Sequence, residues 1–174
     1  MKTMKKILAL ALAEVMALAL LTGCGTGGSA SHKSIAKAME DYSRVIDNNP
    51  DITYISSAEL DAKLQKLAAK PGFEDDVKAF YTQGTLSAIL SGLVPGNNVV
   101  YFYCGKYDKD AGKQAISLNA GDHWTHISPN GGYPSQANER QIGLITTSFT
   151  DDTTHEKVKV RFAVVVSKIP TATP

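Results

Sequence analysis

The first half of the chain is patterned for helices. Beyond Ser34, apolar residues recur at steps of four, three and four, which is the spacing of one helix face. The stripe consists of Ile35, Met39, Tyr42, Val45 and Ile46. Asn48-Asn49-Pro50 then ends the pattern, because proline and asparagine terminate helices. We therefore expect a first amphipathic helix between Ser34 and about residue 47.

Two further helical segments follow a short extended piece at 52–55. Ser56 and Glu59 are spaced as a capping box and predict the start of the second helix, which Pro71-Gly72 ends. The apolar positions of these segments are Leu60, Leu64 and Leu67, then Phe73, Val77, Phe80 and Tyr81, and finally Leu86, Ile89, Leu90 and Leu93. Pro95-Gly96-Asn97-Asn98 is a firm boundary, before which the chain is predicted to be helical.

The second half is patterned for strands. Residues 99–104 form a dense run of β-branched and aromatic side chains. Shorter strands are expected at 114–118 and 124–128. The clearest element is a final hairpin with arms at 142–149 and 158–166 around the turn 151–154. In its second arm Val158, Val160, Phe162, Val164 and Val166 alternate with charged residues, which predicts one buried and one wet face.

Helices followed by strands indicate an α+β fold. We expect N-terminal helices packed on one face of a C-terminal antiparallel β-sheet, a meander that closes with the long hairpin. The single domain should span residues 34–170, and residues 171–174 should form a disordered tail.

The amino terminus has the pattern of an export signal. Lys2, Lys5 and Lys6 precede an apolar run at 7–21, which at about fifteen residues is shorter than the roughly twenty that a spanning helix needs. Leu21-Thr22-Gly23-Cys24 follows this run. Glu14 interrupts it, and a charge in an apolar segment is expected to slow export.

The motif Leu21-Thr22-Gly23-Cys24 resembles the lipobox of bacterial lipoproteins. The resemblance covers only about the first 25 residues. It implies cleavage between Gly23 and Cys24, diacylglycerol on the Cys24 sulfur and an N-acyl chain on its amine. Residues 1–23 would be the signal peptide, and residues 24–33 the lipidated cysteine with a flexible Gly/Ser tether. The protein would then be held on the cell membrane or outer membrane, facing outside the cytoplasm. No other cofactor is predicted.

Charge excludes one class of partner. Removing Lys2, Lys5 and Lys6 from the 18 basic residues and Glu14 from the 17 acidic ones leaves a net charge of about −1. A nucleic-acid-binding protein would show clustered basic residues instead. Because Cys24 is expected to carry lipid, Cys104 has no partner for a disulfide and is predicted to be a buried, inert thiol.

One cluster suggests metal chemistry. Asp122, His123 and His126, with His155 further along, are residue types that hold zinc, and together they could support a metal-assisted hydrolase. On a regular strand, however, His123 and His126 point to opposite faces. Surface histidines near a turn are the simpler interpretation, so a metal centre remains a secondary hypothesis and enzymatic activity is not the leading one.

The leading hypothesis is a binding or interaction module. Trp124 either packs at the edge of the core or, exposed near Tyr133, stacks on sugar rings or anchors a protein partner. The expected partner is a cell-wall glycan or an envelope protein, bound by the loops between Gly121 and Arg140. A third hypothesis is a pilin-like subunit, which requires an unbroken helix from the apolar segment through Ser31.

Overall fold

A computed structural model describes residues 30–93, 96–120, 124–129 and 136–170. The predictions for the signal peptide, Glu14, Gly23 and Cys24 lie outside these residues. So do those for the tether as far as residue 29, for Asp122, His123 and Tyr133, and for the tail at 171–174.

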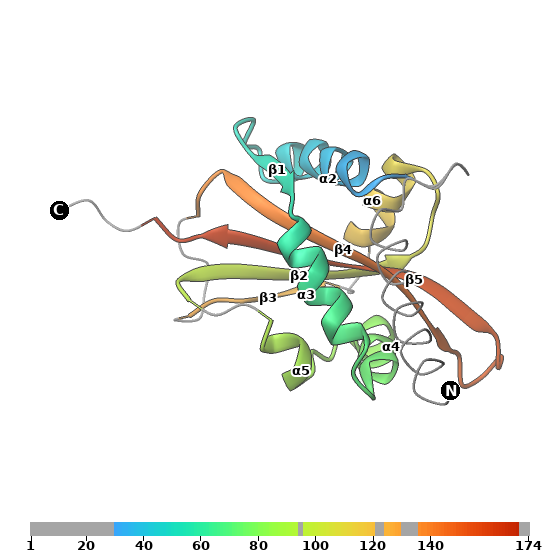
Figure 1. Cartoon of the computed structure of the whole chain (residues 1–174). Helices are drawn as coiled ribbons and strands as arrows, with labels where there is room; N and C mark the ends of the chain where they lie inside the picture. Colours follow the sequence, from blue (N-terminus) through green and yellow to red (C-terminus); the bar gives the residue numbers. More distant parts are fainter. Residues whose placement is uncertain (1–29, 94–95, 121–123, 130–135, 171–174) are drawn as a thin grey trace, which may run out of the picture.

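The predicted α+β class is confirmed (Figure 1). The helices in the described residues are α2 (His32–Ile46), α3 (Ala58–Ala68), α4 (Phe73–Gln83), α5 (Ala88–Ser91) and α6 (Ala111–Asn119). The strands are β1 (Thr53–Ser56), β2 (Asn98–Lys106), β3 (Trp124–Ile127), β4 (Glu139–Thr150) and β5 (Lys157–Lys168).

The sheet differs from the expected antiparallel meander. Its order is β1-β4-β5-β2-β3, and β1 runs parallel to β4 while the other pairs are antiparallel. The consecutive strands β3 and β4 are separated by β5 and β2. The long hairpin of β4 and β5 around residues 151–154 is present as predicted. The sheet is therefore mixed, with a short strand at each edge.

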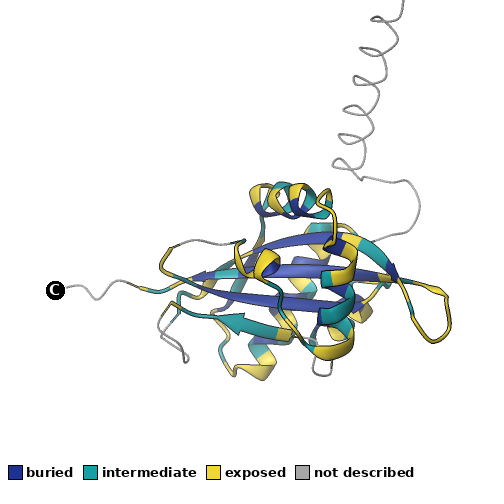
Figure 2. Ribbon diagram, turned by 90° about the horizontal axis from the view of Figure 1, so that it is seen from below, coloured by how far each residue is buried: buried dark blue, intermediate teal, exposed yellow. Residues whose placement is uncertain are grey.

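Helices cover both faces of the sheet, whereas one covered face was expected. In Figure 1, α2 and α6 lie on one side and α4 and α5 on the other. Ile35 and Met39 of α2 pack with Leu118 of α6, whereas Leu64 of α3 and Phe80 of α4 belong to a separate core. Figure 2 shows the central strands buried along most of their length. Two cores thus share one sheet.

This arrangement overturns the prediction that β5 has a wet face. Val160, Phe162 and Val164 point into one core, and Ala163 and Val165 into the other. Arg161, on the face expected to be wet, is only 3% exposed, and its guanidinium lies 5.2 Å from the centre of the Tyr107 ring. The strand therefore alternates between charged and apolar residues only at its start, near the hairpin turn.

Residues 114–118 are helical, although a strand was predicted. They belong to α6, which starts at Asp110, whose side chain accepts a hydrogen bond from the Lys113 amide. Gln114 is fully buried, and its amide bonds the backbone at Lys106 and Asp108. These capping and side-chain bonds favour a helical turn over an extended segment.

Two smaller predictions were also wrong. Ser57, rather than Ser56, caps α3, because Ser56 still belongs to β1. Val45 is exposed and does not widen the buried face of α2. Leu60, Leu64 and Leu67 are buried as the spacing predicted.

Two glycines allow helices to approach the sheet closely. A Cβ at Gly143 of β4 would lie 2.4 Å from the Leu60 Cβ and 2.9 Å from the Leu60 carbonyl carbon. A Cβ at Gly105 of β2 would lie 2.4 Å from the Ser117 carbonyl oxygen. Glycine at these positions sets the distance at which α3 and α6 pack on the strands.

Candidate functional site

A cleft of about 420 Å³ opens between the end of α2 and one end of the sheet. Its lining combines aromatic and polar side chains from elements far apart in the sequence. The residues that matter for its chemistry are Asp47, Tyr101, Tyr103, Trp124, Gln136 and Arg140. Such a concave, mixed surface is the usual form of a small-ligand site.

The end of α2 forms one wall of the cleft. The helix ends at Asp47, and Asn48 follows with φ of 49°, the left-handed conformation that asparagine tolerates at helix ends. Ile46 is 65% exposed, although the sequence pattern placed it on the buried stripe. Its side chain instead faces the cleft.

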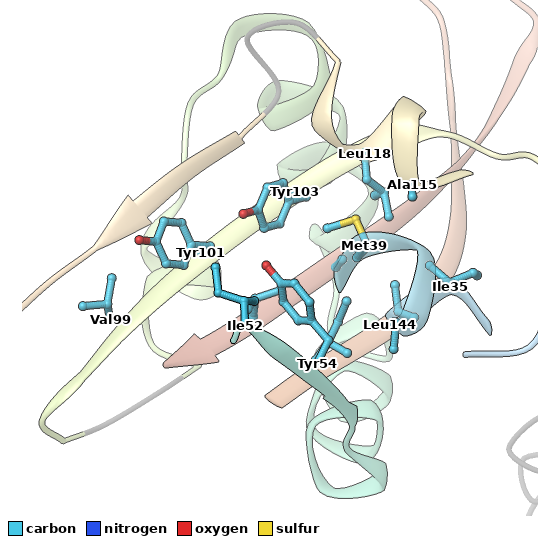
Figure 3. Packing of buried hydrophobic residues seen from close by; sticks show 14 residues of the cluster. Ile35, Met39, Ile52, Tyr54, Val99, Tyr101, Tyr103, Ala115, Leu118 and Leu144 are labelled. Atoms are coloured by element: carbon cyan, nitrogen blue, oxygen red, sulfur yellow. The ribbon is translucent and has the colours of Figure 1, made fainter. Parts of the chain in front are cut away.

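Aromatic rings form the floor. Tyr101 and Tyr103 share one face of β2, and their ring centres lie 6.3 Å apart (Figure 3). Trp124 and His126 of β3 pair with Tyr103 and Tyr101, so they point to the same side of the sheet. The Tyr54 hydroxyl points toward the two β2 tyrosines in Figure 3. The sequence predicted only that Tyr101 and Tyr103 share a face.

Trp124 is 42% exposed and lines the cleft. The interpretation that it fills an edge of the core is therefore wrong, and its candidacy as a binding residue stands. An exposed indole beside buried tyrosines is a surface on which a ligand ring can stack.

Arg140 places a cation between two of these rings. Its guanidinium carbon lies 5.9 Å from the ring centres of both Tyr54 and Tyr101. Nη1 is 3.4 Å from the Tyr54 hydroxyl, and Nη2 is 3.3 Å from Oδ2 of Asp47. Nε is buried and has no hydrogen-bond partner. Arg140 is thus a cation that is fixed by its neighbours but does not use all of its hydrogen-bond donors.

Burial lowers the pKa of Arg140, but the Tyr54 hydroxyl and the Asp47 carboxylate outweigh it, and the pKa is raised overall. Arg140 therefore keeps its charge. Burial raises the pKa of Tyr101 and, well above its usual range, that of Tyr103. These phenols stay neutral at ordinary pH. The cleft consequently offers one cation, neutral hydroxyls and aromatic faces.

Gln136 lies beside the same tyrosine. Its Nε2 donates to the Tyr101 hydroxyl at 2.6 Å, while its Oε1 is buried without a partner. Buried polar atoms normally have a partner, so an orphaned acceptor needs an explanation. Gln136 Oε1 and Arg140 Nε are thus an unsatisfied acceptor and an unsatisfied donor on two side chains that both contact Tyr101.

Of the candidate metal ligands, the structure describes His126 and His155, and these two lie far apart. His126 packs against Tyr101, with ring centres 5.9 Å apart. His155 lies in the hairpin turn, at the far end of β5 from Val165, the residue that pairs with Tyr101. At about 3.3 Å per strand residue the separation is about 26 Å or more. Over the described part of the chain, which excludes Asp122 and His123, no group of three potential metal ligands is found.

Cys104 is fully buried in the core opposite the cleft, and burial raises the pKa of its thiol to about 12. The predicted buried thiol is confirmed. Because the thiolate is the reactive form, native protein at pH 8 should react with iodoacetamide at Cys104 at least about 100-fold more slowly than protein unfolded in urea. Mass spectrometry of the peptide containing Cys104 measures both rates. Similar rates would show that the thiol is accessible in the folded state.

Comparisons with protein-family models, curated proteins and solved structures give no match for this chain. In the described residues, no helix is both long enough and apolar enough to span a bilayer. Ser31 has an extended backbone and caps α2 through its hydroxyl, so the helix starts there. The unbroken helix through Ser31 that a pilin-like subunit requires is therefore not formed.

Proposed function

We propose that this chain is a lipid-anchored module of the bacterial cell envelope that faces outside the cytoplasm and binds a cell-wall glycan in the cleft. The lipobox-like motif ending at Cys24 supports the anchor. The cleft supports the binding role. Trp124, Gln136 and Arg140, which line it, belong to the segment from Gly121 to Arg140 in which the partner was expected, and its other lining residues come from earlier parts of the chain.

The observation that carries the proposal is the pairing of an exposed indole with unsatisfied polar atoms in one concavity. Sugars present an apolar ring face and a rim of hydroxyls. Trp124 offers the stacking surface, and Gln136 and Arg140 offer an acceptor and a donor within the same cleft. Asp47 is the carboxylate among the described residues that line the cleft, and it is paired with Arg140.

Replacing Trp124 by alanine should weaken glycan binding about tenfold, because truncation of a central aromatic anchor typically has an effect of this size. The measurement is co-sedimentation of the full chain with purified, insoluble cell-wall sacculi, in a detergent without a sugar head group. The matched control is Ile116→Ala, which truncates an exposed apolar side chain of α6 outside the cleft.

The unmodified chain should sediment with the sacculi, and the control should do the same. A wild-type chain that stays in the supernatant would contradict the proposal. An equal loss in both variants would show that the binding surface is not the cleft. Binding to envelope proteins alone would favour the protein partner instead.

A further inference from the structure

We infer, on the basis of the proposed function, that the glycan carries a carboxylate, which displaces Asp47 from Arg140. Beside the carboxylate the ligand presents a hydroxyl or amide N–H that donates to Gln136. An acidic sugar combines these groups on one ring. The inference follows from three observations: the contacts of Arg140 are long, Asp47 is partly exposed, and Gln136 has an acceptor atom without a partner.

Arg140 is bonded more weakly than its setting allows. Its side chain is only 11% exposed, yet its distances to the Asp47 carboxylate and the Tyr54 hydroxyl are 3.3 and 3.4 Å. Hydrogen bonds between a guanidinium and a carboxylate are usually about 2.7–2.9 Å long and often bidentate. Nε is also unpartnered, so the guanidinium has donor capacity that its present contacts leave unused.

Asp47 is positioned to be displaced. Its side chain is 42% exposed, whereas that of Arg140 is nearly buried. A displaced Asp47 carboxylate would move into water at the end of α2 and would not be left unsolvated. A ligand carboxylate that replaces it keeps the cation neutralised. Because the ligand carboxylate would take the place of Asp47 beside Arg140, the buried guanidinium would not be left without a counter-charge.

The unpartnered Gln136 Oε1 restricts the second group of the ligand. An acceptor needs a donor, and a second carboxylate has none. A sugar hydroxyl or an N-acetyl N–H supplies it. Arg140 and Gln136 both contact Tyr101, from its ring face and from its hydroxyl, so the two ligand groups must be close together.

The charge of the ligand distinguishes this inference from the alternatives of a cationic or a neutral ligand. Arg140 and Asp47 are the charged residues among those lining the described cleft. A cationic ligand would bind Asp47, and a neutral ligand would leave their ion pair intact. Only an anionic ligand competes with Asp47 for Arg140. Removing the Asp47 charge therefore changes the affinity in opposite directions for anionic and cationic ligands.

The test uses two pairs of sugars that differ in a carboxylate. N-acetylmuramic acid is N-acetylglucosamine with a lactyl ether that carries the acid, and glucuronate is compared with glucose. Titration calorimetry or ligand-observed NMR with the full chain, in a detergent without a sugar head group, gives the affinities. Each acid should bind at least about tenfold more tightly than its neutral partner, as expected for a hydrogen bond to a charged group.

Asp47→Asn should increase the affinity for the acids severalfold more than it changes the affinity for the neutral sugars. The control is Asp41→Asn, which removes an exposed α2 carboxylate that pairs with Lys37 and should change neither. Equal affinities for acid and neutral sugar, or weaker acid binding by Asp47→Asn, would overturn the inference and leave the proposed glycan binding intact. Binding of neither member of either pair would contradict the proposed function and the inference with it.

Discussion

Replacing Gly143 by alanine should lower the free energy of unfolding by about 2–3 kcal/mol, because an added methyl group has no space between β4 and α3. The new Cβ would lie 2.4 Å from the Leu60 Cβ and 2.9 Å from the Leu60 carbonyl carbon, so helix backbone must move. The movement also stretches the bond in which Oδ1 of Asp61 accepts the Leu144 amide at 2.7 Å. The melting temperature should fall by about 4–12 °C for a chain of this size.

The control for Gly143→Ala is Gly112→Ala. Gly112 lies in α6, and a Cβ there would meet only Oδ1 of Asp110, at 3.4 Å. Because alanine favours helix over glycine by about 0.5–1 kcal/mol, this variant should be as stable as the parent or slightly more stable. Thermal denaturation followed by circular dichroism measures both variants. Equal melting temperatures would mean that α3 does not pack against β4 as closely as described.

Replacing Cys24 by serine should move the protein from the membrane fraction to the soluble fraction. The proposed anchor depends on that sulfur, and each buried CH₂ of an acyl chain contributes about 0.8 kcal/mol of membrane binding. Loss of two or more acyl chains should therefore shift nearly all of the protein from the membrane fraction to the soluble fraction. Fractionation of cells, with mass spectrometry of the amino terminus, measures the location and the attached lipid together.

The control for Cys24→Ser is the other cysteine of the chain. Cys104→Ala removes a buried thiol in the core and should leave the protein on the membrane. A Cys24→Ser chain that remains in the membrane fraction would contradict lipid anchoring. An unmodified thiol at Cys24 in the native protein would do the same.

The elements that the sequence predicted well are those whose local pattern and packing agree. Leu60, Leu64 and Leu67 are buried on one face of α3, and Phe73, Val77 and Phe80 on one face of α4. In each case the helix has one apolar face, and burying that face requires contact with only one other surface. The α+β class and the final hairpin followed from the same kind of regularity.

The errors arise where tertiary packing overrides local pattern. Residues 114–118 carry a short apolar alternation, but the cap at Asp110 and the buried Gln114 amide stabilise a helix there. The charged start of β5 suggested a wet face, yet Arg161 is buried and its guanidinium packs against the ring of Tyr107. No local pattern shows that a second layer of helices will bury a charged position.

The candidate site was predictable only in part. The sequence singled out Trp124 because it is the sole tryptophan and lies near Tyr133. Arg140 marked only the end of the predicted loop region. The roles of Asp47 and Gln136 depend on β1 pairing with β4, which brings the end of α2 beside Arg140. That contact joins residues 47 and 140, and a single sequence contains no signal for it.

The direction of α2 has a further consequence for an anchored chain. Its first residue, His32, lies at the end of the proposed tether of residues 24–33, of which residues 32 and 33 are helical, and its last, Ile46, reaches the cleft. At about 1.5 Å per residue the helix is about 22 Å long, and its rigidity fixes that separation. Because α2 packs on the sheet as part of the domain, the cleft would lie about one helix length from the point where the proposed tether joins the domain.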